Sequence, residues 1–217
     1  MPMDGLMTGF VAEELNRALA GGRIDRITQP ERDTVIMTVR AGNENRSLLL
    51  CASPNNARCH LTGLKYSNPL EPPALCMLLR KQLLGGRVTG VRQIGGDRIV
   101  YVDMDIVNEM GDREERRLVL EMMGRHSSLM LLNGEGRILE AARHVNAEMS
   151  RVRQVQPGLM YEAPPAQDRL PREGMSGEAL AERVAREGAV PFEKALANAI
   201  YGLSRRSWRT ELAGRAE

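Results

Sequence analysis

The chain has 217 residues, 42% of them hydrophobic, and a formal net charge of +2 at neutral pH. A chain of this length can bury one good core, with room for a small second unit. The near-neutral charge excludes a polycation, so any nucleic-acid contact has to come from local clusters of Arg and Lys. Aromatic residues make up 3%, which argues against a single-strand binder that stacks bases on its side chains.

Targeting, redox and cofactor motifs are lacking. No apolar run approaches the ~20 residues that span a bilayer, and Met1–Gly5 do not resemble a secretory signal, so we expect a cytoplasmic protein without a membrane segment. Cys51, Cys59 and Cys76 have no metal-binding spacing, so buried free thiols are expected. The sequence has no Walker loop, dinucleotide glycine fingerprint or HExxH motif, and we expect neither a metal nor a cofactor.

The predicted elements form two series, each a helix followed by antiparallel strands. The first helix covers residues 5–20 and ends at Gly21-Gly22, and alternating apolar residues then predict strands at 24–28, 35–40, 48–52 and 58–62. A second helix over 73–84 ends at Gly85-Gly86. It precedes a charged hairpin loop at 108–117 and strands at 88–94, 99–106, 118–123, 129–132 and 138–142.

The second series repeats the first at a constant offset of 64 residues: Gly21-Gly22-Arg23 recurs as Gly85-Gly86-Arg87, and Asp33 corresponds to Asp97. We interpret this as one helix-plus-sheet unit used twice, at about residues 5–62 and 73–143. Two such units packed face to face predict a sandwich-like α+β domain over residues 1–156.

The composition changes near the C-terminus. Residues 157–175 are rich in Pro, Gln, Asp and Arg without periodicity, which predicts a linker. Three short helices are expected after it, at 177–187, 191–201 and 204–216. The Gly202-Leu203-Ser204 turn is compatible with a helix-hairpin-helix module. We therefore interpret residues 176–217 as the start of such a domain, truncated after its last predicted helix.

Asp97-Arg98 occupies a turn between two predicted strands, where a rigid scaffold can present side chains. One interpretation is an aspartate that caps the turn beside a solvated arginine. The other is an arginine offered to a phosphate or a base edge, with the aspartate orienting it or accepting a hydrogen bond from a base.

A second dense stretch runs from Glu121 to Ser128. His126 could act as a base, but no partnered serine and carboxylate can be inferred beside it, so catalysis is not predicted. Arg125 and His126 are expected either to fix the loop by hydrogen bonds or to hold phosphate.

Two basic clusters allow a similar choice between a solvated surface and a patch that follows phosphates. The first surrounds the second helix and the strand after it: Arg80, Lys81, Arg87, Arg92 and Arg98. The second lies beside Trp208 in the last predicted helix and comprises Arg205, Arg206 and Arg209. The start of a helix in a helix-hairpin-helix commonly holds a backbone phosphate.

Several motifs together resemble those of one family. They are Asp4-Gly5, Gly21-Gly22-Arg23-Ile24, Gln29-Pro30, Glu71-Pro72-Pro73, Cys76 to Lys81, Gly96-Asp97-Arg98 and Glu121 to Ser127. In this order and spacing the chain resembles the NFACT family, also called the fibronectin-binding protein A family, from Met3 to about Ala216. RqcH-like and NEMF-related factors belong to it, and the resemblance covers its N-terminal domain.

That resemblance implies ribosome-associated quality control. Family members bind large ribosomal subunits obstructed by peptidyl-tRNA and recruit tRNA, charged with alanine in bacteria, for template-free extension of the stalled chain. The ribosome forms the peptide bond, so the resemblance implies a binding factor and not an enzyme. It assigns tRNA binding to Asp97, Arg98, Glu121, Met122 and Met123, where Met122 stands at a position that is often Ile. Further phosphate contacts are expected at Arg80, Lys81, Arg87, Arg125, His126, Arg205 and Arg206.

Two alternatives follow from the same resemblance. The family's N-terminal domain is similar to that of the formamidopyrimidine DNA glycosylases, which use an N-terminal proline amine followed by glutamate. Pro2 could supply the amine, but Met3 replaces the glutamate, and a lyase needs both groups. The older family name implies a surface adhesin that binds fibronectin, which requires export.

Overall fold

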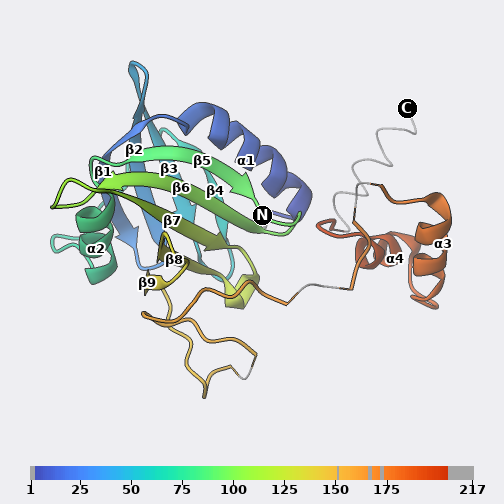
Figure 1. The fold of residues 1–217 in the computed structure, drawn as a ribbon. Helices are drawn as coiled ribbons and strands as arrows, with labels where there is room; N and C mark the ends of the chain where they lie inside the picture. Colours follow the sequence, from blue (N-terminus) through green and yellow to red (C-terminus); the bar gives the residue numbers. More distant parts are fainter. Residues whose placement is uncertain (1–2, 151, 166–167, 172–173, 205–217) are drawn as a thin grey trace.

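The computed structural model describes residues 3–150, 152–165, 168–171 and 174–204. Nine strands form one antiparallel sheet in the order β4-β3-β2-β1-β5-β6-β7-β8-β9 (Figure 1). The strands are β1 Arg23–Glu31, β2 Thr34–Ala41, β3 Glu44–Cys51, β4 Arg58–Thr62, β5 Arg87–Gln93, β6 Ile99–Val107, β7 Arg113–Glu121, β8 Ser128–Asn133 and β9 Ile138–Ala141. The helices are α1 Gly5–Leu19, α2 Ala74–Leu83, the 3₁₀ turn η1 Gly124–His126, α3 Gly177–Ala185 and α4 Phe192–Ala199. The predicted α+β class is confirmed.

Helix α1 has a capping residue, Asp4, before its first turn and a glycine, Gly21, after its last. The Asp4 carboxylate accepts a hydrogen bond from the Met7 N–H at 3.0 Å, which satisfies one of the free donors at the helix start. Leu15 and Leu19 on its inner face are buried against the sheet. The helix stops before Gly21, which takes a left-handed φ of +80°.

The two series of elements meet at β1 and β5 through reciprocal backbone hydrogen bonds. The Gly21 N–H donates to the Val88 carbonyl at 2.8 Å, and the Gly85 N–H donates to the Ile24 carbonyl at 2.9 Å. Each donor and acceptor is 64 residues from its counterpart, so the same contact is made twice. Gly86 is buried at this junction, and a side chain would not fit there because an added Cβ would lie 2.8 Å from the Ile106 side chain.

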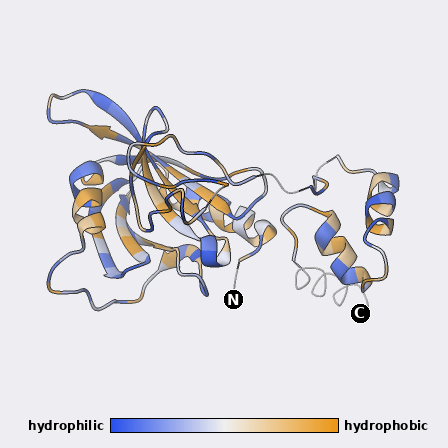
Figure 2. Cartoon of the chain, turned by 90° about the horizontal axis from the view of Figure 1, so that it is seen from below, coloured by the Kyte–Doolittle hydropathy of each residue, from blue (hydrophilic) through white to orange (hydrophobic). Residues whose placement is uncertain are grey.

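The sheet folds over so that its two halves face each other. In Figure 1, β5, β6 and β7 pass in front of β2, β3 and β4, and the strands in the middle of the domain are largely apolar in Figure 2. Met37 and Leu50 from the first half share one buried cluster with Val102 and Leu120 from the second. The two predicted sheet units are parts of one continuous sheet in the structure, because β1 pairs with β5.

Two predicted loop boundaries differ from the structure. The hairpin loop predicted at 108–117 is wrong in its second half, since Arg113–Arg117 already belong to β7 and pair with β6. This end of the hairpin carries charged side chains and little buried surface, so the apolar alternation that marks a strand is missing. The first residues of the predicted linker are attached to the sheet: the Gly158 N–H donates to Ile138, and the Tyr161 N–H donates to Gly136.

Beyond this attachment lies a helical unit, which we define as the described residues from 168 to 204. It contains α3 and α4, and its first segment pairs with its last, because the Leu170 N–H donates to the Ala199 carbonyl and the Tyr201 N–H donates back to Leu170. The third predicted helix, at 204–216, lies almost wholly outside the described residues. In the described part of the chain, no helix is long and apolar enough to cross a membrane.

The three thiols are expected to be unreactive in the native protein at pH 8. Cys51, Cys59 and Cys76 are at most 2% exposed, and burial raises the pKa of Cys59 to about 12 and also raises that of Cys76. Because the thiolate is the reactive form, both accessibility and ionisation oppose labelling. Titration with a chromogenic aromatic disulfide should count no thiols in native buffer and three in guanidinium. Rapid labelling of the native protein would contradict this packing.

Candidate nucleic-acid interface

The residues singled out in the sequence fall into two groups at opposite ends of β5. Asp97 and Arg98 follow the C-terminal end of this strand, whereas Arg87 begins it. At ~3.3 Å per residue the two ends are roughly 20 Å apart. The described candidates therefore form no single surface patch, and the site has to be built separately at each end.

Hydrogen bonds from the backbone and from Gln93 hold the Asp97-Arg98 turn in place. The Asp97 N–H donates to the Ile94 carbonyl at 3.0 Å, and the Asp97 carboxylate, 7% exposed, accepts a hydrogen bond from the Arg98 N–H at 2.7 Å. Gln93 donates to the Asp97 carbonyl from β5. Asp97 thus caps the turn, while the partly exposed Arg98 side chain has no hydrogen bond or ion pair to the described residues.

The Glu121 side chain is 1% exposed and lies on the face of β7 that the segment after β9 covers. Arg153 forms a two-pronged ion pair with it at 2.6 and 2.7 Å, and the Tyr161 hydroxyl donates to the same carboxylate at 2.9 Å. Burial lowers the pKa of Arg153, but the hydrogen bond and charge of Glu121 outweigh that effect and the pKa is raised. Burial and the Glu121 charge raise the pKa of Tyr161. Glu121 therefore anchors the segment that follows β9 to the sheet.

The structure places the Asp97-Arg98 turn beside the stretch that begins at Glu121. Ile99 pairs with Glu121 across β6 and β7, and the Met122 N–H donates to the Arg98 carbonyl at 2.9 Å. The Met122 side chain is 2% exposed and belongs to the main core, whereas Met123 is half buried and faces a pocket. Among these neighbours, Arg98 and Met123 are the side chains that a ligand can reach.

That pocket is a hollow of about 580 Å³ between η1 and the segment after β9. Arg125 and His126 lie at its edge, exposed, with the Arg125 Nε donating to the His126 ring at 3.0 Å. Arg143 lines it as well, and its guanidinium donates to the Arg125 carbonyl at 2.7 Å. Its apolar wall is formed by Met123, Val145, Met149, Val152, Val155, Pro164 and Pro165.

Two buried hydroxyls in this pocket have no hydrogen-bond partner among the described residues. They are the Oγ atoms of Ser127 and Ser128, whose residues are 2% and 4% exposed. An unsatisfied buried hydroxyl costs about 1–3 kcal/mol. The pocket therefore combines apolar walls, two unpaired hydroxyls and cations at its edge.

Ser128→Ala is expected to leave the free energy of unfolding unchanged or to raise it by up to about 1 kcal/mol, because the hydroxyl makes no bond that would be lost. Urea denaturation of the two proteins checks this, with Thr8→Ala as a control, since the buried Thr8 hydroxyl donates to the Asp4 carbonyl. The control should be destabilised by about 1 kcal/mol. A larger loss at Ser128 than at Thr8 would show that Ser128 has a structural partner.

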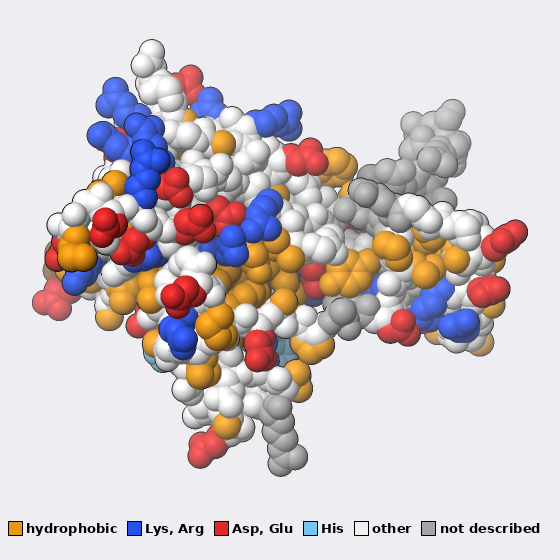
Figure 3. Space-filling model, in the orientation of Figure 1, with side chains coloured by type: hydrophobic (Ala, Val, Ile, Leu, Met, Phe, Trp, Pro, Cys, Tyr) orange, Lys and Arg blue, Asp and Glu red, His pale blue; other side chains and the backbone are white. Residues whose placement is uncertain are grey.

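At the other end of β5, the predicted phosphate contacts are divided between structural and exposed cations. Arg80 donates to the Ile27 carbonyl at 2.8 Å and so fixes α2 on β1, whereas Lys81 is exposed. Arg40, Arg23 and Arg87 pair in one row across β2, β1 and β5, all three exposed. We name these three the arginine row. Figure 3 shows Lys and Arg side chains gathered at the upper left, at that side of the sheet.

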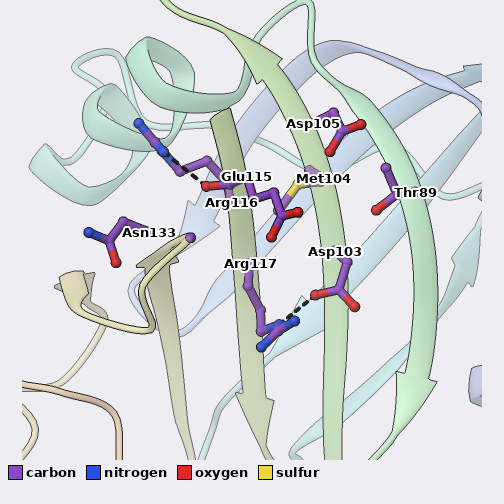
Figure 4. A pocket seen from close by; sticks show the side chains of 9 residues that line it. Thr89, Asp103, Met104, Asp105, Glu115, Arg116, Arg117 and Asn133 are labelled. Carbon is purple, nitrogen blue, oxygen red and sulfur yellow. Dashed lines mark hydrogen bonds and ion pairs between the residues drawn. The ribbon is translucent and has the colours of Figure 1, made fainter. Parts of the chain in front are cut away.

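A second hollow, of about 410 Å³, lies on the outer face of β5, β6 and β7 (Figure 4). Part of its charge is neutralised, because Asp103 pairs with Arg117 in the hollow and with Arg92 beside it. Both guanidinium groups also lie over the ring of Tyr101, at 5.0 and 4.7 Å. This surface network is satisfied internally and gives no indication of a ligand.

Several residues at these sites were not predicted from the sequence. Arg143, Arg153 and Tyr161 lie in segments without periodicity, and nothing local indicates that they fold back beside Glu121. The arginine row could have been found, because pairing the predicted strands at the repeated diglycines brings Arg23 opposite Arg87. Pro2, Arg205 and Arg206 lie outside the described residues. Among the described residues, no group of His, Cys, Asp and Glu is arranged to hold a metal ion.

Comparison with known proteins gives consistent matches. The chain is 39% identical over 206 residues to the Rqc2 homolog RqcH of Bacillus subtilis, covering 94% of this chain and 36% of that protein. It is 26% identical over 143 residues to the human ribosome quality control complex subunit NEMF, covering 66% of this chain and 12% of that protein. The chain spans about a third of the length of the bacterial relatives it matches.

Solved structures agree in fold. The N-terminal domain of the fibronectin-binding protein PavA from Streptococcus pneumoniae superposes with a TM-score of 0.86 at 31% identity, covering 98% of this chain and 80% of that one. The family model described as NFACT N-terminal and middle domains matches residues 4–217. Because that match covers nearly the whole chain, this protein belongs to the NFACT family, which includes these ribosome quality control proteins.

Proposed function

We propose that this chain is the tRNA-binding part of a ribosome-associated quality control factor in the cytoplasm. In this proposal it binds large ribosomal subunits obstructed by peptidyl-tRNA and recruits tRNA, alanyl-tRNA above all, for template-free extension of the stalled chain. The ribosome forms the peptide bond, so the protein contributes binding and positioning. The RqcH and NEMF relatives support the process, and the pocket beside Arg125 is the observation that supports RNA as the ligand.

The pocket has the chemistry that an unpaired base requires. Proteins that recognise single-stranded RNA receive the face of a splayed base on apolar or planar side chains and bond its edge with polar groups. Here the walls are apolar, the buried hydroxyls of Ser127 and Ser128 behind them have no partner among the described residues, and Arg125 and Arg143 are close enough to bind the neighbouring phosphates. A volume of about 580 Å³ lies in the range of small-molecule sites and can hold a nucleotide.

Direct contacts within this site are assigned to Met123, Arg125 and His126, with Arg98 beside them. Glu121 and Met122 act from below the surface, since both are buried, and they hold the pocket wall and the Arg98 backbone in place. The arginine row and Lys81 extend the basic surface to the other end of β5, where a longer RNA can follow them. Such phosphate contacts make the affinity fall with added salt.

The test is binding of fluorescently labelled tRNA, by anisotropy, to the full-length protein and to this chain over a series of salt concentrations. Arg125→Ala and Arg143→Ala should each weaken binding about tenfold and lower the salt slope by about one. Arg113→Ala, an exposed arginine on the distal part of β7, is the matched control and should change neither. If the full-length protein binds tRNA no better than a DNA hairpin of equal charge, the proposal is wrong.

Fibronectin binding is a second candidate, favoured by the PavA neighbour, whose structure carries that name. The exposed apolar side chains Met7 and Phe10 on α1 would be available to such a partner. Binding of the chain to immobilised fibronectin, compared with binding to tRNA in the same buffer, separates the two candidates. A micromolar or tighter complex with fibronectin alone would favour the adhesin.

We further propose that the domain arose by duplication and is similar in fold to the N-terminal domain of formamidopyrimidine DNA glycosylase. The reciprocal bonds at Gly21 and Gly85 support this. We also propose that α3 and α4 begin a helix-hairpin-helix domain after a linker. Lyase chemistry at Pro2 is the least favoured function, and borohydride trapping on abasic DNA would reveal it.

A further inference from the structure

Among the described residues, the helical unit meets the sheet domain where residues 201–204 lie against the start of α1 and the Asp97 turn. Figure 1 shows α3 and α4 set apart from the sheet, with the N-terminal end of α1 turned toward them. The Leu6 N–H donates to the Gly202 carbonyl at 3.0 Å, and the Ser204 hydroxyl donates to the Asp4 carboxylate at 2.8 Å. A hollow of about 250 Å³ opens beside this contact.

Three glycine backbones cross at the contact with no space between them. A Cβ added to Gly5 would lie 2.2 Å from the Gly96 carbonyl oxygen, and one added to Gly202 would lie 2.4 Å from the same atom. Gly202 also has a left-handed φ of +77°. The approach therefore requires glycine on both sides, one in the helical unit and one in the sheet domain.

A buried carboxylate links the same two parts. The Tyr201 hydroxyl donates to one oxygen of Asp97 at 2.9 Å, while the other oxygen accepts the Arg98 N–H at 2.7 Å. Both oxygens of Asp97 are thus occupied, and the group is 7% exposed. The Asp97 carboxylate is therefore poorly placed to bond a ligand. The side chain of Arg98, which is partly exposed, can still do so.

We propose that Gly5, Gly96, Asp97, Tyr201 and Gly202 form a latch that fixes the helical unit on the sheet domain and positions Arg98. Asp97 is then a positioning residue, which acts through Tyr201 and Arg98 without touching RNA. The part of this proposal that concerns RNA rests on the proposed function, whereas the latch itself does not.

The latch explains why an aspartate precedes Arg98. The backbone of Arg98 is held on both sides, by the Asp97 carboxylate at its N–H and by the Met122 N–H at its carbonyl. Arg169 comes from the helical unit and lines the same 250 Å³ hollow as Arg98. The spacing of these two cations, one from each unit, therefore depends on the latch.

The first test measures the distance between the units. Spin labels on cysteines introduced at the exposed positions Glu14 in α1 and Glu182 in α3 report it by pulsed electron paramagnetic resonance, and the native cysteines are buried. The parent should give one narrow distance distribution. Tyr201→Phe, which removes a single hydroxyl, and Gly202→Ala should both broaden it, and narrow distributions in both variants would overturn the latch.

Two controls isolate the cause. Gly188→Ala places a side chain at φ +70° in the same helical unit but in open space, so it carries the backbone strain of Gly202→Ala without the clash. Tyr66→Phe removes a tyrosine hydroxyl for which the described residues provide no hydrogen bond. Both should keep the narrow distribution.

The second test measures tRNA affinity in the same variants. Tyr201→Phe should weaken binding about tenfold, as expected for losing a hydrogen bond to a charged group, although Tyr201 is not assigned an RNA contact. In an Asp97→Ala background the further change Tyr201→Phe should cost much less, since the two side chains act through one hydrogen bond. A broadened distance with unchanged affinity would overturn the positioning role. If the parent binds no tRNA, the proposed function fails, and the distance measurement still decides the latch.

Discussion

Arg153→Met is expected to lower the free energy of unfolding by about 3–5 kcal/mol, because it leaves the Glu121 carboxylate charged, buried and without its cation. The Glu121 side chain is 1% exposed and that of Arg153 14%, so solvent screens this pair little. Tyr161 keeps one hydrogen bond to the carboxylate, which cannot replace a two-pronged ion pair. Urea denaturation at neutral pH, followed by circular dichroism, measures the loss.

A double variant separates the penalty of an unpaired charge from the net value of the ion pair. Glu121→Gln combined with Arg153→Met should recover part of the loss, since no charge remains buried. Arg23→Met is the surface control: its partner Asp25 is exposed, and removing such a pair changes stability by less than about 1 kcal/mol. Equal losses at Arg23 and Arg153 would contradict the anchoring role of Glu121.

Arg98→Ala is expected to weaken tRNA binding by about 1–3 kcal/mol if the guanidinium bonds a base edge, and by less if it meets only phosphate. Because no described residue bonds this side chain, the unfolding free energy should stay within about 0.5 kcal/mol of the parent. Filter binding of tRNA at fixed salt, together with urea denaturation, gives both quantities.

The matched control is Arg26→Ala, an exposed arginine on β1 for which no interaction with the described residues is present. It removes the same charge from the same domain and should leave affinity nearly unchanged. Asp97→Ala is the companion variant: it should reduce affinity as well, but it should also loosen the helical unit. Equal tRNA affinity in Arg98→Ala and Arg26→Ala would remove Arg98 from the interface.

The order of elements and the main core could be predicted from the sequence. Apolar residues at two-residue spacing define the strands, and the diglycines that begin at Gly21 and Gly85 follow the two helices where a left-handed turn is needed. These signals are local, since a strand or helix turns one face to the core wherever it lies. The outer half of the β6–β7 hairpin was missed because its charged side chains hide the alternation.

The residues of the candidate site were proposed from the sequence, but their burial was not predicted. Asp97-Arg98 and Glu121–Met123 were identified from a turn position and a family resemblance, and the pairing of β6 with β7 brings them together. Burial then divides them: Arg98 and Met123 can be reached, whereas Asp97, Glu121 and Met122 support them from inside. Burial is a property of the packed chain, so a single sequence does not indicate it for a polar residue in a turn.

The sequence by itself determined the order of the helices and strands in the sheet domain and which residue types stand in its turns. Tertiary structure alone decided the partners of Glu121 and Asp97, because Arg153, Tyr161 and Tyr201 reach them across 32, 40 and 104 residues of chain. Bonds at such separations depend on how the chain packs, and no local pattern encodes them. For the same reason, the sequence identifies Asp97 only as a turn residue, whereas the structure shows that it also bonds Tyr201 of the helical unit.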